Sequence, residues 1–471
     1  MPRVVIVSNR VADLRKKSQT GGLAVALADA MRERGGIWFG WSGETKEEAA
    51  PAVAETIGRV AAVSLPLSRR EVEEYYLGYA NSVLWPLFHY RLDLVDHRPN
   101  FLDTYAAVNR RFATELVPYL EEDDLVWVQD YHLMPLAARL RELGCRNRIG
   151  FFLHIPFPPP DMLAATSNHR EMVEWLLEFD LVGLQTSTDV GNLTRYLEEH
   201  MGLEEIGGAY RHGSRQVRVE RFPIGIDPVG FAAMAREEPD DVAIDLMRRK
   251  LLGQRQIIGV DRLDYSKGLP ERLRAYGRLL VQHPEYERVV SFLQIAPPTR
   301  EDVDAYAEIR LELEALAGSI NGRFAEFNWT PIRYIHRPVS REKLAPLLRA
   351  SDVGFVTPLR DGMNLVAKEY VAAQDVEDPG VLVLSRFAGA AEELDAALLV
   401  NPYDVDEMSR RLHQALEMPL AERRRRHEEL LEKVMRQNAT AWLESFLEVL
   451  ERPDGNQEAG TADQVAAFRA K

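Results

Sequence analysis

Nine short apolar runs, separated by longer amphipathic segments, constrain the fold of this chain more than any other feature. Each run has four to seven residues, and most are rich in Val, Ile or Phe. Uninterrupted apolar runs of this length are typical of strands that are covered on both faces, as in parallel α/β sheets. The runs lie at residues 4–7, 125–128, 149–153, 181–184, 257–260, 289–295, 353–356, 381–384 and 397–400.

Helical patterns lie between these runs and complete a strand–helix–strand rhythm. This rhythm predicts the α/β class, with doubly wound parallel sheets of the Rossmann-like kind. A chain of 471 residues corresponds to two or three domains at ~100–200 residues each, and two is the simplest expectation. The helical patterns are at residues 101–120, 133–143, 187–200, 269–282, 301–317 and 403–417.

The alternation of strand-like and helical patterns is interrupted around residues 203–230. We expect the domain boundary to lie there. A turn-forming pair, Asp227 and Pro228, follows the last strand-like stretch of the first half. We therefore expect one domain over 1–228 and a second over 229–450, with a last helix at 438–450 that packs back on the first domain. Residues 451–471 are expected to form a mobile tail, because the segment 453–464 contains almost no apolar side chains.

Composition excludes several classes of function. Lys and Arg total 58 and Asp and Glu total 73, so the formal net charge is −15, which argues against binding nucleic acid or an anionic membrane through a basic field. Cys145 is the only cysteine, so no internal disulfide or thiolate zinc cluster can form. The amino terminus has only four consecutive apolar residues and does not read as a signal peptide. We expect a cytoplasmic protein without a membrane span.

The most informative residues lie just after the apolar runs, where open parallel sheets bind ligands. Arg262 and Lys267 follow the run at 257–260 and suit a diphosphate, because Arg offers a planar fork and Lys a mobile charge. Gly21 and Gly22 precede a helical pattern, where backbone N–H groups can approach a phosphate. The alternatives are surface ion pairs for the two cations and a simple flexible loop for the glycines.

The segment 353–374 carries a second set of polar residues. Asp361 follows a strand and a turn, and Glu369 lies eight residues later in the helical pattern, so both can approach one side of a ligand at the helix start. The N–H groups near Asn364 and Leu365 could hold an outer phosphate. The alternative is that Asp361 only caps the helix, which is the commoner role for such a residue taken alone.

A third set, in the first half, combines aromatic rings with polar groups. Rings stack on sugar faces, while Asp and His form hydrogen bonds with hydroxyl groups. Each aromatic residue taken singly is more typical of a core position, and a buried imidazole explains His132 equally well. The set comprises Trp41, Tyr76, Trp85, Asp130, His132 and His154, and Arg300 adds a cation after another strand.

The sequence predicts neither a metal site nor a cofactor. Asp404 and Asp406 match the D-x-D pattern of a class of metal-binding glycosyltransferases, but they begin a helix after Pro402. Capping of that helix and its dipole account for both carboxylates. The fingerprint G-x-G-x-x-G is absent, so a nicotinamide dehydrogenase is not supported either.

Ten strings in order resemble the trehalose-6-phosphate synthases, above all the bacterial type. Together they cover residues 4 to about 402, which is nearly the whole folded chain. The strings are VSNR, GGLAVAL, WFGWSGE, NSVLWPLFHYRLDLV, DYHLMP, FFLHIPFP, DRLDYSKGLPER, QIAPPTRED, TPLRDGMNLVAKEYVAAQ and VLVLSRFAGAA.

The resemblance implies a retaining glycosyltransferase of GT-B architecture, in which two Rossmann-like domains face each other across a cleft. The implied reaction transfers glucose from UDP-glucose to glucose 6-phosphate and gives α,α-trehalose 6-phosphate and UDP. The first domain would bind the acceptor and the second the nucleotide sugar. Enzymes of this kind are often homo-oligomers, whereas neither periodicity nor charge indicates an oligomeric state for this chain.

The resemblance also implies roles for individual donor-site residues. Gly22, Arg262 and Lys267 would bind the diphosphate, with Gly21 beside them. The first turns of the helix after Asp361 would assist through Leu365, Val366, Ala367, Lys368 and Glu369.

For the rest of the donor, Val339 would lie beside the uracil and Glu369 would hold the ribose hydroxyls. Asp361 and His154 would bind the donor glucose. These positions follow from the matching strings and are numbered in this sequence.

For the acceptor, Arg10, Tyr76 and Arg300 would bind the phosphate, while Trp85 would line the pocket and Asp130 would bond the sugar. Trp41 belongs to the same set. The residues implied in catalysis are Asp130, His154, Arg262, Lys267 and Asp361.

The implied mechanism is metal-independent front-face substitution, in which the departing diphosphate takes the proton of the incoming hydroxyl. Double displacement would instead need a carboxylate nucleophile with an acid partner ~5–5.5 Å away. Three alternatives stay open at the level of sequence. They are a GDP- or ADP-glucose donor, glycerol 3-phosphate as acceptor, and a non-catalytic sugar-phosphate sensor on the same fold.

Overall fold

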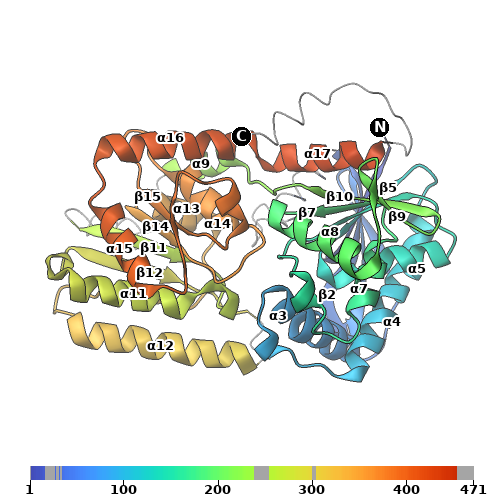
Figure 1. The fold of residues 1–471 in the computed structure, drawn as a ribbon, viewed down its shortest axis with the longest axis horizontal. Helices are drawn as coiled ribbons and strands as arrows, with labels where there is room; N and C mark the ends of the chain where they lie inside the picture. Colours follow the sequence, from blue (N-terminus) through green and yellow to red (C-terminus); the bar gives the residue numbers. More distant parts are fainter. Residues whose placement is uncertain are drawn as a thin grey trace.

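Two α/β units lie side by side in the computed structural model (Figure 1). The structure describes residues 2–15, 27, 31, 34–237, 254–299 and 304–452. Each unit is built on one sheet, which confirms the predicted fold class of two doubly wound α/β units. None of the helices in these ranges is long and apolar enough to cross a membrane.

The sheet of the first unit is mixed, with a parallel centre. Its strand order is β3-β4-β2-β1-β5-β6-β7-β10-β9-β8. The central pairs are parallel, whereas β3, β9 and β8 pair antiparallel at the two edges. The strands are β1 (Val4–Arg10), β2 (Gly36–Lys46), β3 (Val53–Ile57), β4 (Val60–Ser68), β5 (Leu125–Gln129), β6 (Arg148–Phe152), β7 (Leu181–Leu184), β8 (Glu205–Ile206), β9 (Ala209–His212) and β10 (Arg215–Arg221).

Helices of this unit pack against one face of its sheet, in the core that contains Val5, Val7 and Val126. One of them is unusual, because the segment η1 (Val72–Leu84) is a π-helix that runs into α3 (Trp85–Phe88). The others are α2 (Arg69–Glu71), α4 (Pro99–Leu116), α5 (Leu136–Glu142), α6 (Pro160–Leu163), α7 (His169–Leu176) and α8 (Ser187–Met201), with short 3₁₀ turns η2 (Leu92–Leu94), η3 (Val117–Tyr119) and η4 (Tyr131–Leu133).

The second unit has a fully parallel sheet in the order β13-β12-β11-β14-β15-β16. Its strands are β11 (Arg255–Val260), β12 (Val290–Ile295), β13 (Ile332–Ile335), β14 (Val353–Val356), β15 (Val381–Ser385) and β16 (Leu398–Val400). Its helices are α9 (Pro228–Arg236), α11 (Leu269–Gln282), α12 (Asp304–Phe324), α13 (Arg341–Arg349), α14 (Leu365–Ala373), α15 (Val405–Leu416) and α16 (Leu420–Arg436), with 3₁₀ turns η5 (Tyr265–Lys267), η6 (Pro284–Tyr286) and η7 (Gly389–Glu392).

The last helix, α17 (Ala439–Glu451), crosses from the second unit to the first. Figure 1 shows α16 over the second unit and α17 over the first. The ring of Phe446 stacks on Trp127 at 4.6 Å between centroids. A Cβ at Gly150 or Gly183 would lie 2.7 Å from the Phe446 ring, so these two strand glycines make room for the helix. Residues 453–471, most of the expected tail, lie outside the described residues.

The structure adds elements that the sequence pattern did not predict. β2 and β4 were not recognised as strands, and the antiparallel edges depart from a purely parallel first sheet. The edge strands were missed for a physical reason. β3 is exposed along most of its length and β8 along all of it, so neither carries the apolar run that marks a buried strand. All nine predicted runs lie in or overlap strands.

Candidate active site

The carboxyl edges of the two sheets carry the candidate residues. In the first unit Ser8, Gln129 and Phe152 lie in register, so Arg10, Asp130 and His154 leave three neighbouring strands at the same edge. In the second unit β11 and β14 are parallel neighbours, and their carboxyl ends lead to 261–267 and 357–361. This placement agrees with the rule that open α/β sheets bind ligands beyond their carboxyl ends.

Lys267 and Asp361 form the central polar pair of the second unit. Lys267 Nζ donates to Asp361 Oδ2 at 2.6 Å, and both side chains are largely buried. Asn364 Nδ2 donates to the same oxygen at 3.1 Å. The alternative role of Asp361, as the helix cap, is not observed, because the side chain of Asn364 caps α14. Asp361 is left to face Lys267.

A second buried ion pair lies beside the first and is joined to it by a hydrogen-bonding side chain. Arg272 Nη2 donates to Asp261 Oδ2 at 2.7 Å, with both side chains almost completely buried. Asn364 Nδ2 also lies 3.2 Å from Asp261 Oδ1, so one amide joins the two pairs. Burial raises the pKa of Asp261, while Arg272 opposes that shift. The network holds the loop before α14 firmly against the end of β11.

The two units touch at His154. A Cβ at Gly362 would lie 2.1 Å from the His154 carbonyl oxygen, so only glycine permits this close approach. The His154 backbone N–H donates to Asp130 Oδ1 at 3.1 Å, and its Nε2 lies 2.9 Å from Gln129 Oε1. Burial lowers the pKa of His154 to about 3, so the ring is neutral at pH 7. Asp361, next to Gly362, is thereby brought to the His154 side of the interface.

A series of rings runs along the first unit from Arg10 towards Arg262. The Arg10 guanidinium lies 5.8 Å from the Trp41 ring, and Trp41 lies 5.6 Å from Tyr76. Tyr76 stacks on His132 at 5.8 Å, an arrangement with a 14° angle between planes. The structure thus gives His132 a place beside a proposed acceptor residue.

The series ends at the interface between the units. Trp85 lies 5.8 Å from Tyr131, and the exposed guanidinium of Arg262 lies 5.6 Å from the Trp85 ring. Since Arg262 belongs to the second unit, Trp85 is a first-unit residue in contact with a candidate donor residue. A cation held over an indole face is attracted by about 0.5–2 kcal/mol.

The side chains of the remaining donor candidates lie in two different regions. Glu369 Oε1 accepts from Arg341 Nη2 at 3.0 Å, and burial raises its pKa. Val339, two residues before Arg341, is partly buried in the same region. Lys368 Nζ instead donates to Ile224 O at 2.8 Å in the first unit. The backbones of Leu365, Val366 and Ala367 form the first turn of α14.

Three predicted residues, Gly21, Gly22 and Arg300, lie outside the described residues. Three other side chains join the site: those of Gln129 and Arg341, which were not singled out, and that of Asn364, for which only a backbone role was predicted. Each pairs with a predicted residue, namely His154, Glu369 and Asp361. A sequence signal was present for two of them, because Gln129 ends an apolar run and Asn364 precedes the helical pattern. Arg341 had no such signal.

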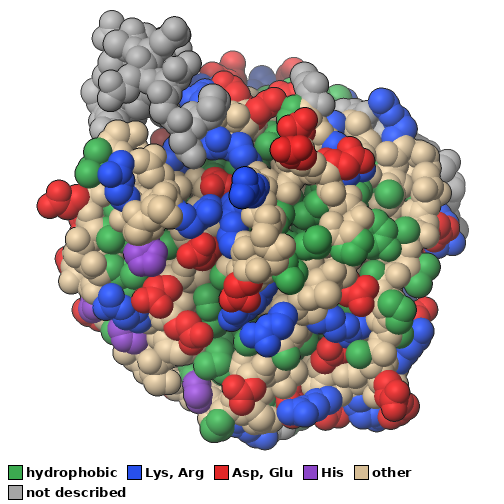
Figure 2. Space-filling model, turned by 90° about the vertical axis from the view of Figure 1, so that its right-hand side faces the viewer, with side chains coloured by type: hydrophobic (Ala, Val, Ile, Leu, Met, Phe, Trp, Pro, Cys, Tyr) green, Lys and Arg blue, Asp and Glu red, His purple; other side chains and the backbone are tan. Residues whose placement is uncertain are grey.

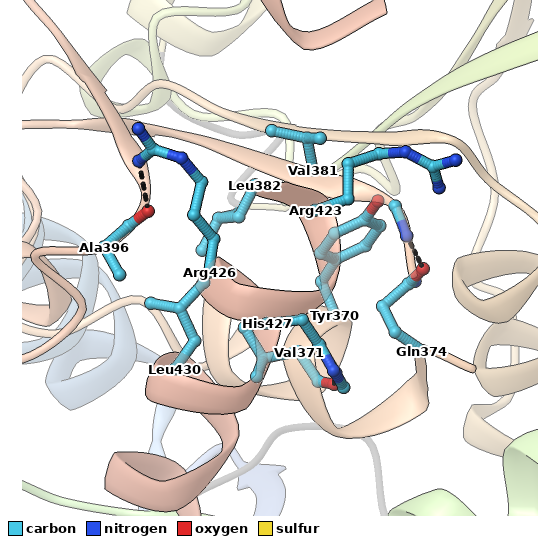
Figure 3. Close-up of a pocket in the computed structure, with 11 residues that line it drawn as sticks. Tyr370, Val371, Gln374, Val381, Leu382, Ala396, Arg423, Arg426, His427 and Leu430 are labelled. Atoms are coloured by element: carbon cyan, nitrogen blue, oxygen red, sulfur yellow. Dashed lines mark hydrogen bonds between the residues drawn. The ribbon is translucent and has the colours of Figure 1, made fainter. Parts of the chain in front are cut away.

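Two other features of the second unit do not belong to the site. Asp404 caps α15 by accepting from the Glu407 N–H at 2.8 Å, and Asp406 pairs with Arg278, so both carboxylates have the structural roles predicted for them. A small pocket between α14 and α16 is lined by Tyr370, His427 and Arg426 (Figure 3).

The polar groups of that pocket are already engaged within the protein. Arg426 donates to Ala396 O at 2.8 Å, and His427 Nε2 lies 3.0 Å from Val371 O. The pocket therefore offers a ligand little that is unsatisfied.

Charged side chains on the outer surface are mixed in sign. Figure 2 shows Lys and Arg interspersed with Asp and Glu on the face of the first unit that turns away from the second. No broad basic area is visible on that face, which agrees with the net charge of −15. A mixed surface of this kind provides no basic field for an anionic ligand on that face.

Known proteins resemble this chain over nearly its whole length. Trehalose-6-phosphate synthase from Enterobacter sp. (strain 638) is 46% identical over 474 aligned residues, which cover 99% of each chain. A solved α,α-trehalose-phosphate synthase (UDP-forming) from Burkholderia xenovorans, in complex with glucose-6-phosphate, is 49% identical. It has a TM-score of 0.92 and covers 96% of this chain and 100% of its own.

A solved structure from E. coli, bound with UDP-2-fluoro glucose, is 45% identical with a TM-score of 0.92, covering 96% of this chain and 99% of its own. Residues 4–452 match the profile of glycosyltransferase family 20. Both candidate edges, with Lys267, Asp361 and His154, lie within this matched range. The chain is a member of glycosyltransferase family 20.

Proposed function

We propose that this protein is a UDP-forming trehalose-6-phosphate synthase, which transfers glucose from UDP-glucose to glucose 6-phosphate. The products are α,α-trehalose 6-phosphate and UDP. The observation that carries the proposal is the contact between the units at which Gly362, next to Asp361, lies against the backbone carbonyl of His154. Lys267 pairs with Asp361, and Arg262 lies over Trp85 of the other unit. The relatives with this name and these ligands support it.

The donor binds mainly to the second unit in this proposal. Arg262 and Lys267 neutralise the diphosphate, together with Gly22 and the positive end of α14. The network of Asp261, Arg272 and Asn364 supports the pair from which Lys267 reaches the ligand.

The other donor contacts extend from this point in both directions. Glu369, aligned by Arg341, holds the ribose hydroxyls, and Val339 lies beside the uracil. Asp361 and His154 bond the glucose. A neutral His154 can donate or accept a hydrogen bond with a hydroxyl without adding charge beside the sugar.

The acceptor binds to the first unit. Arg10, Tyr76 and Arg300 bind its phosphate, and the rings of Trp41 and Trp85 bound the sugar. Asp130 has an unusual backbone with φ of 72° and accepts the His154 N–H. This arrangement places the carboxylate of Asp130 next to the residue that holds the donor glucose.

The proposed chemistry is front-face substitution with retention. The bond from C1 of the donor glucose to the diphosphate oxygen breaks, and a bond from C1 to the anomeric oxygen of glucose 6-phosphate forms on the same face. The proton of that hydroxyl passes to the departing diphosphate oxygen. Arg262 and Lys267 stabilise the negative charge of the leaving group, so catalysis consists of positioning and electrostatic stabilisation.

We propose that the reaction needs no metal ion. Treatment with a chelator should leave the rate unchanged. Loss of activity with the chelator and its return with Mg²⁺ would contradict this part of the proposal.

The proposed boundary between acceptor and donor domains is near Asp227 and Pro228. Asp227 caps α9 by accepting the Gly230 N–H at 2.9 Å, which ends the extended segment that leaves the first sheet. Closure of the cleft would then take place about this point and about the segment before α17.

A panel of donors and acceptors, with chromatography of the products, tests the substrates. The proposal predicts a product with UDP-glucose and glucose 6-phosphate that exceeds every other pair. A larger yield with GDP- or ADP-glucose, or with glycerol 3-phosphate, would assign a different transferase. The absence of any product would favour a sugar-phosphate sensor.

A further inference from the structure

A carboxylate of the second unit caps a helix of the first. Glu392, at the end of η7, accepts the Ser187 N–H at 2.9 Å on Oε2. Its Oε1 accepts the Thr188 N–H at 3.2 Å and the Thr188 hydroxyl at 3.0 Å. Because α8 begins at Ser187, the carboxylate lies at the positive end of a 15-residue helix, where unpaired N–H groups favour an anion.

Helix α8 does not need Glu392 in order to form. Thr186 is its own N-cap, with a side chain that accepts the Asp189 N–H at 3.0 Å. If the units moved apart, water could bond the N–H groups of Ser187 and Thr188, which lie in exposed surroundings. The bonds from Glu392 therefore serve mainly to join the two units.

On its own side, Glu392 is tied closely to Asp361. The Asp361 N–H donates to Phe387 O at 3.1 Å, and the Gly389 N–H donates to Asp361 O at 3.1 Å. The Ala390 N–H donates to Met363 O at 2.8 Å. Turn η7 and the loop that carries Asp361 are thus one hydrogen-bonded body, so a shift of Glu392 would move Asp361.

On the other side, the first turn of α8 is tied to the loop that carries His154. Asp189 Oδ1 accepts the Phe157 N–H at 2.8 Å, and Asn192 Nδ2 donates to Phe157 O at 2.9 Å. Phe157 lies only three residues after His154. A path of hydrogen bonds therefore runs from Asp361 through Glu392 and α8 to the His154 loop.

A nearby cation completes the contact. Arg221 Nε lies 3.6 Å from Glu392 Oε2, and Arg221 Nη2 lies 3.6 Å from Glu393 Oε1. Arg221 belongs to the first unit and both glutamates to the second. The side chain of Glu392 is 28% exposed, so the contact can open to solvent without disrupting either core.

We infer that Glu392 is a positioning residue. Its carboxylate joins the two units and holds the loop of Asp361 in place relative to the loop of His154. The inference rests on the proposed function, because those two residues bind the donor glucose there. Glu392 itself touches no substrate. Its effect is on how often the two halves of the site are aligned, and misplacement by ~1 Å can lower a rate by about 10²-fold.

The test compares Glu392→Ala and Glu392→Gln with Asp404→Ala. Asp404 is a matched control, because it also caps a helix with its carboxylate but does so within the second unit. For each variant we would measure kcat for UDP release, the Kd of UDP without acceptor, the melting temperature and the radius of gyration by small-angle X-ray scattering.

The inference predicts that Glu392→Ala lowers kcat about tenfold or more, leaves the Kd of UDP within about twofold and increases the radius of gyration. Glu392→Gln keeps one carbonyl acceptor and should show a smaller loss of kcat. Asp404→Ala should lower the melting temperature and leave kcat unchanged. A kcat for Glu392→Ala equal to that of the wild type, or a loss equal to that of Asp404→Ala, would overturn the inference.

The proposed function fails separately, if the wild-type protein releases no UDP. The scattering measurement then still tests whether Glu392 holds the two units together, since it does not depend on turnover. If Glu392→Ala does not fold, Glu392→Gln decides the question by the same measurements.

Discussion

Lys267 Nζ lies 2.6 Å from Asp361 Oδ2, and the two side chains are only 9% and 14% exposed. The cation proposed for the donor diphosphate is thus held by the carboxylate proposed for the donor sugar. Without a ligand, each neutralises the other in a place where an unpaired charge would be costly. A bound diphosphate would share Lys267 with Asp361 and draw both groups to the reacting bond.

Replacing Lys267 with Met should therefore damage both activity and stability. It leaves the largely buried Asp361 carboxylate without its cation, although the Asn364 amide still donates to it, and this should lower the free energy of unfolding by on the order of 3 kcal/mol. We expect kcat to fall at least a hundredfold. Chemical denaturation and UDP release measure the two effects, with Lys267→Arg as the variant that keeps the charge. A stability equal to that of the wild type would contradict the buried pair.

Arg262→Ala should separate activity from stability, because the Arg262 side chain is exposed and lies over Trp85. An exposed cation over a ring contributes only about 0.5–1 kcal/mol, so the free energy of unfolding should fall by no more than about that amount. We expect kcat to fall much more than the KM of the acceptor rises. Steady-state kinetics with glucose 6-phosphate measure both, and an unchanged kcat would remove Arg262 from the stabilisation of the leaving group.

Stability should fall in mild acid because of His89. The ring is 3% exposed, its Nδ1 lies 2.7 Å from Trp85 O, and burial lowers its pKa to about 4. Between pH 6.5 and 4 the unfolded chain takes up a proton at this residue and the folded protein does not. The folded state consequently loses stability as the pH falls through this range, by about 2 kcal/mol at pH 5.

Denaturation at pH 7.5 and pH 5.0 measures this loss in the wild type and in His89→Gln. We expect the difference between the two pH values to be smaller in the variant. The exposed His97 provides a control, and His97→Gln should behave as the wild type does. An identical pH dependence in His89→Gln would show that His89 is not the source.

Lys368 is expected to act through structure. Its Nζ lies 2.6 Å from Glu393 Oε2, and the two side chains are 1% and 3% exposed. Lys368→Met should cost about 3–5 kcal/mol, because it leaves a carboxylate buried with only the more distant Arg221 nearby. Combining it with Glu393→Leu should restore much of the stability. UDP binding by the folded variant should match the wild type, and a large loss of UDP affinity would instead give the amine a role in the donor site.

The sequence alone was enough to predict the strands of both sheet centres and the edges at which the candidate residues lie. The run at 257–260 and Lys267 after it show why: a buried strand has a clear apolar pattern, and its carboxyl end is defined once the sheet is parallel. The sequence pattern predicted where each candidate residue lies along the chain. It did not predict which residue each side chain contacts.

The pairing of residues depends on contacts between distant segments, which no local pattern records. Lys267 and Asp361 are 94 positions apart, and Ser187 and Glu392 are 205 apart. Lys368 lies one residue before Glu369, yet its side chain bonds Ile224 in the other unit, whereas Glu369 bonds Arg341. Helix rotation and the packing of the two units decide such directions, so these contacts required the structure.

Release of UDP from UDP-glucose, measured with and without glucose 6-phosphate, tests the central claim most directly. We expect slow release from the donor alone and a large increase when glucose 6-phosphate is added, and Lys267→Met should abolish that increase. Release that is the same with and without glucose 6-phosphate, or no release under either condition, would contradict it.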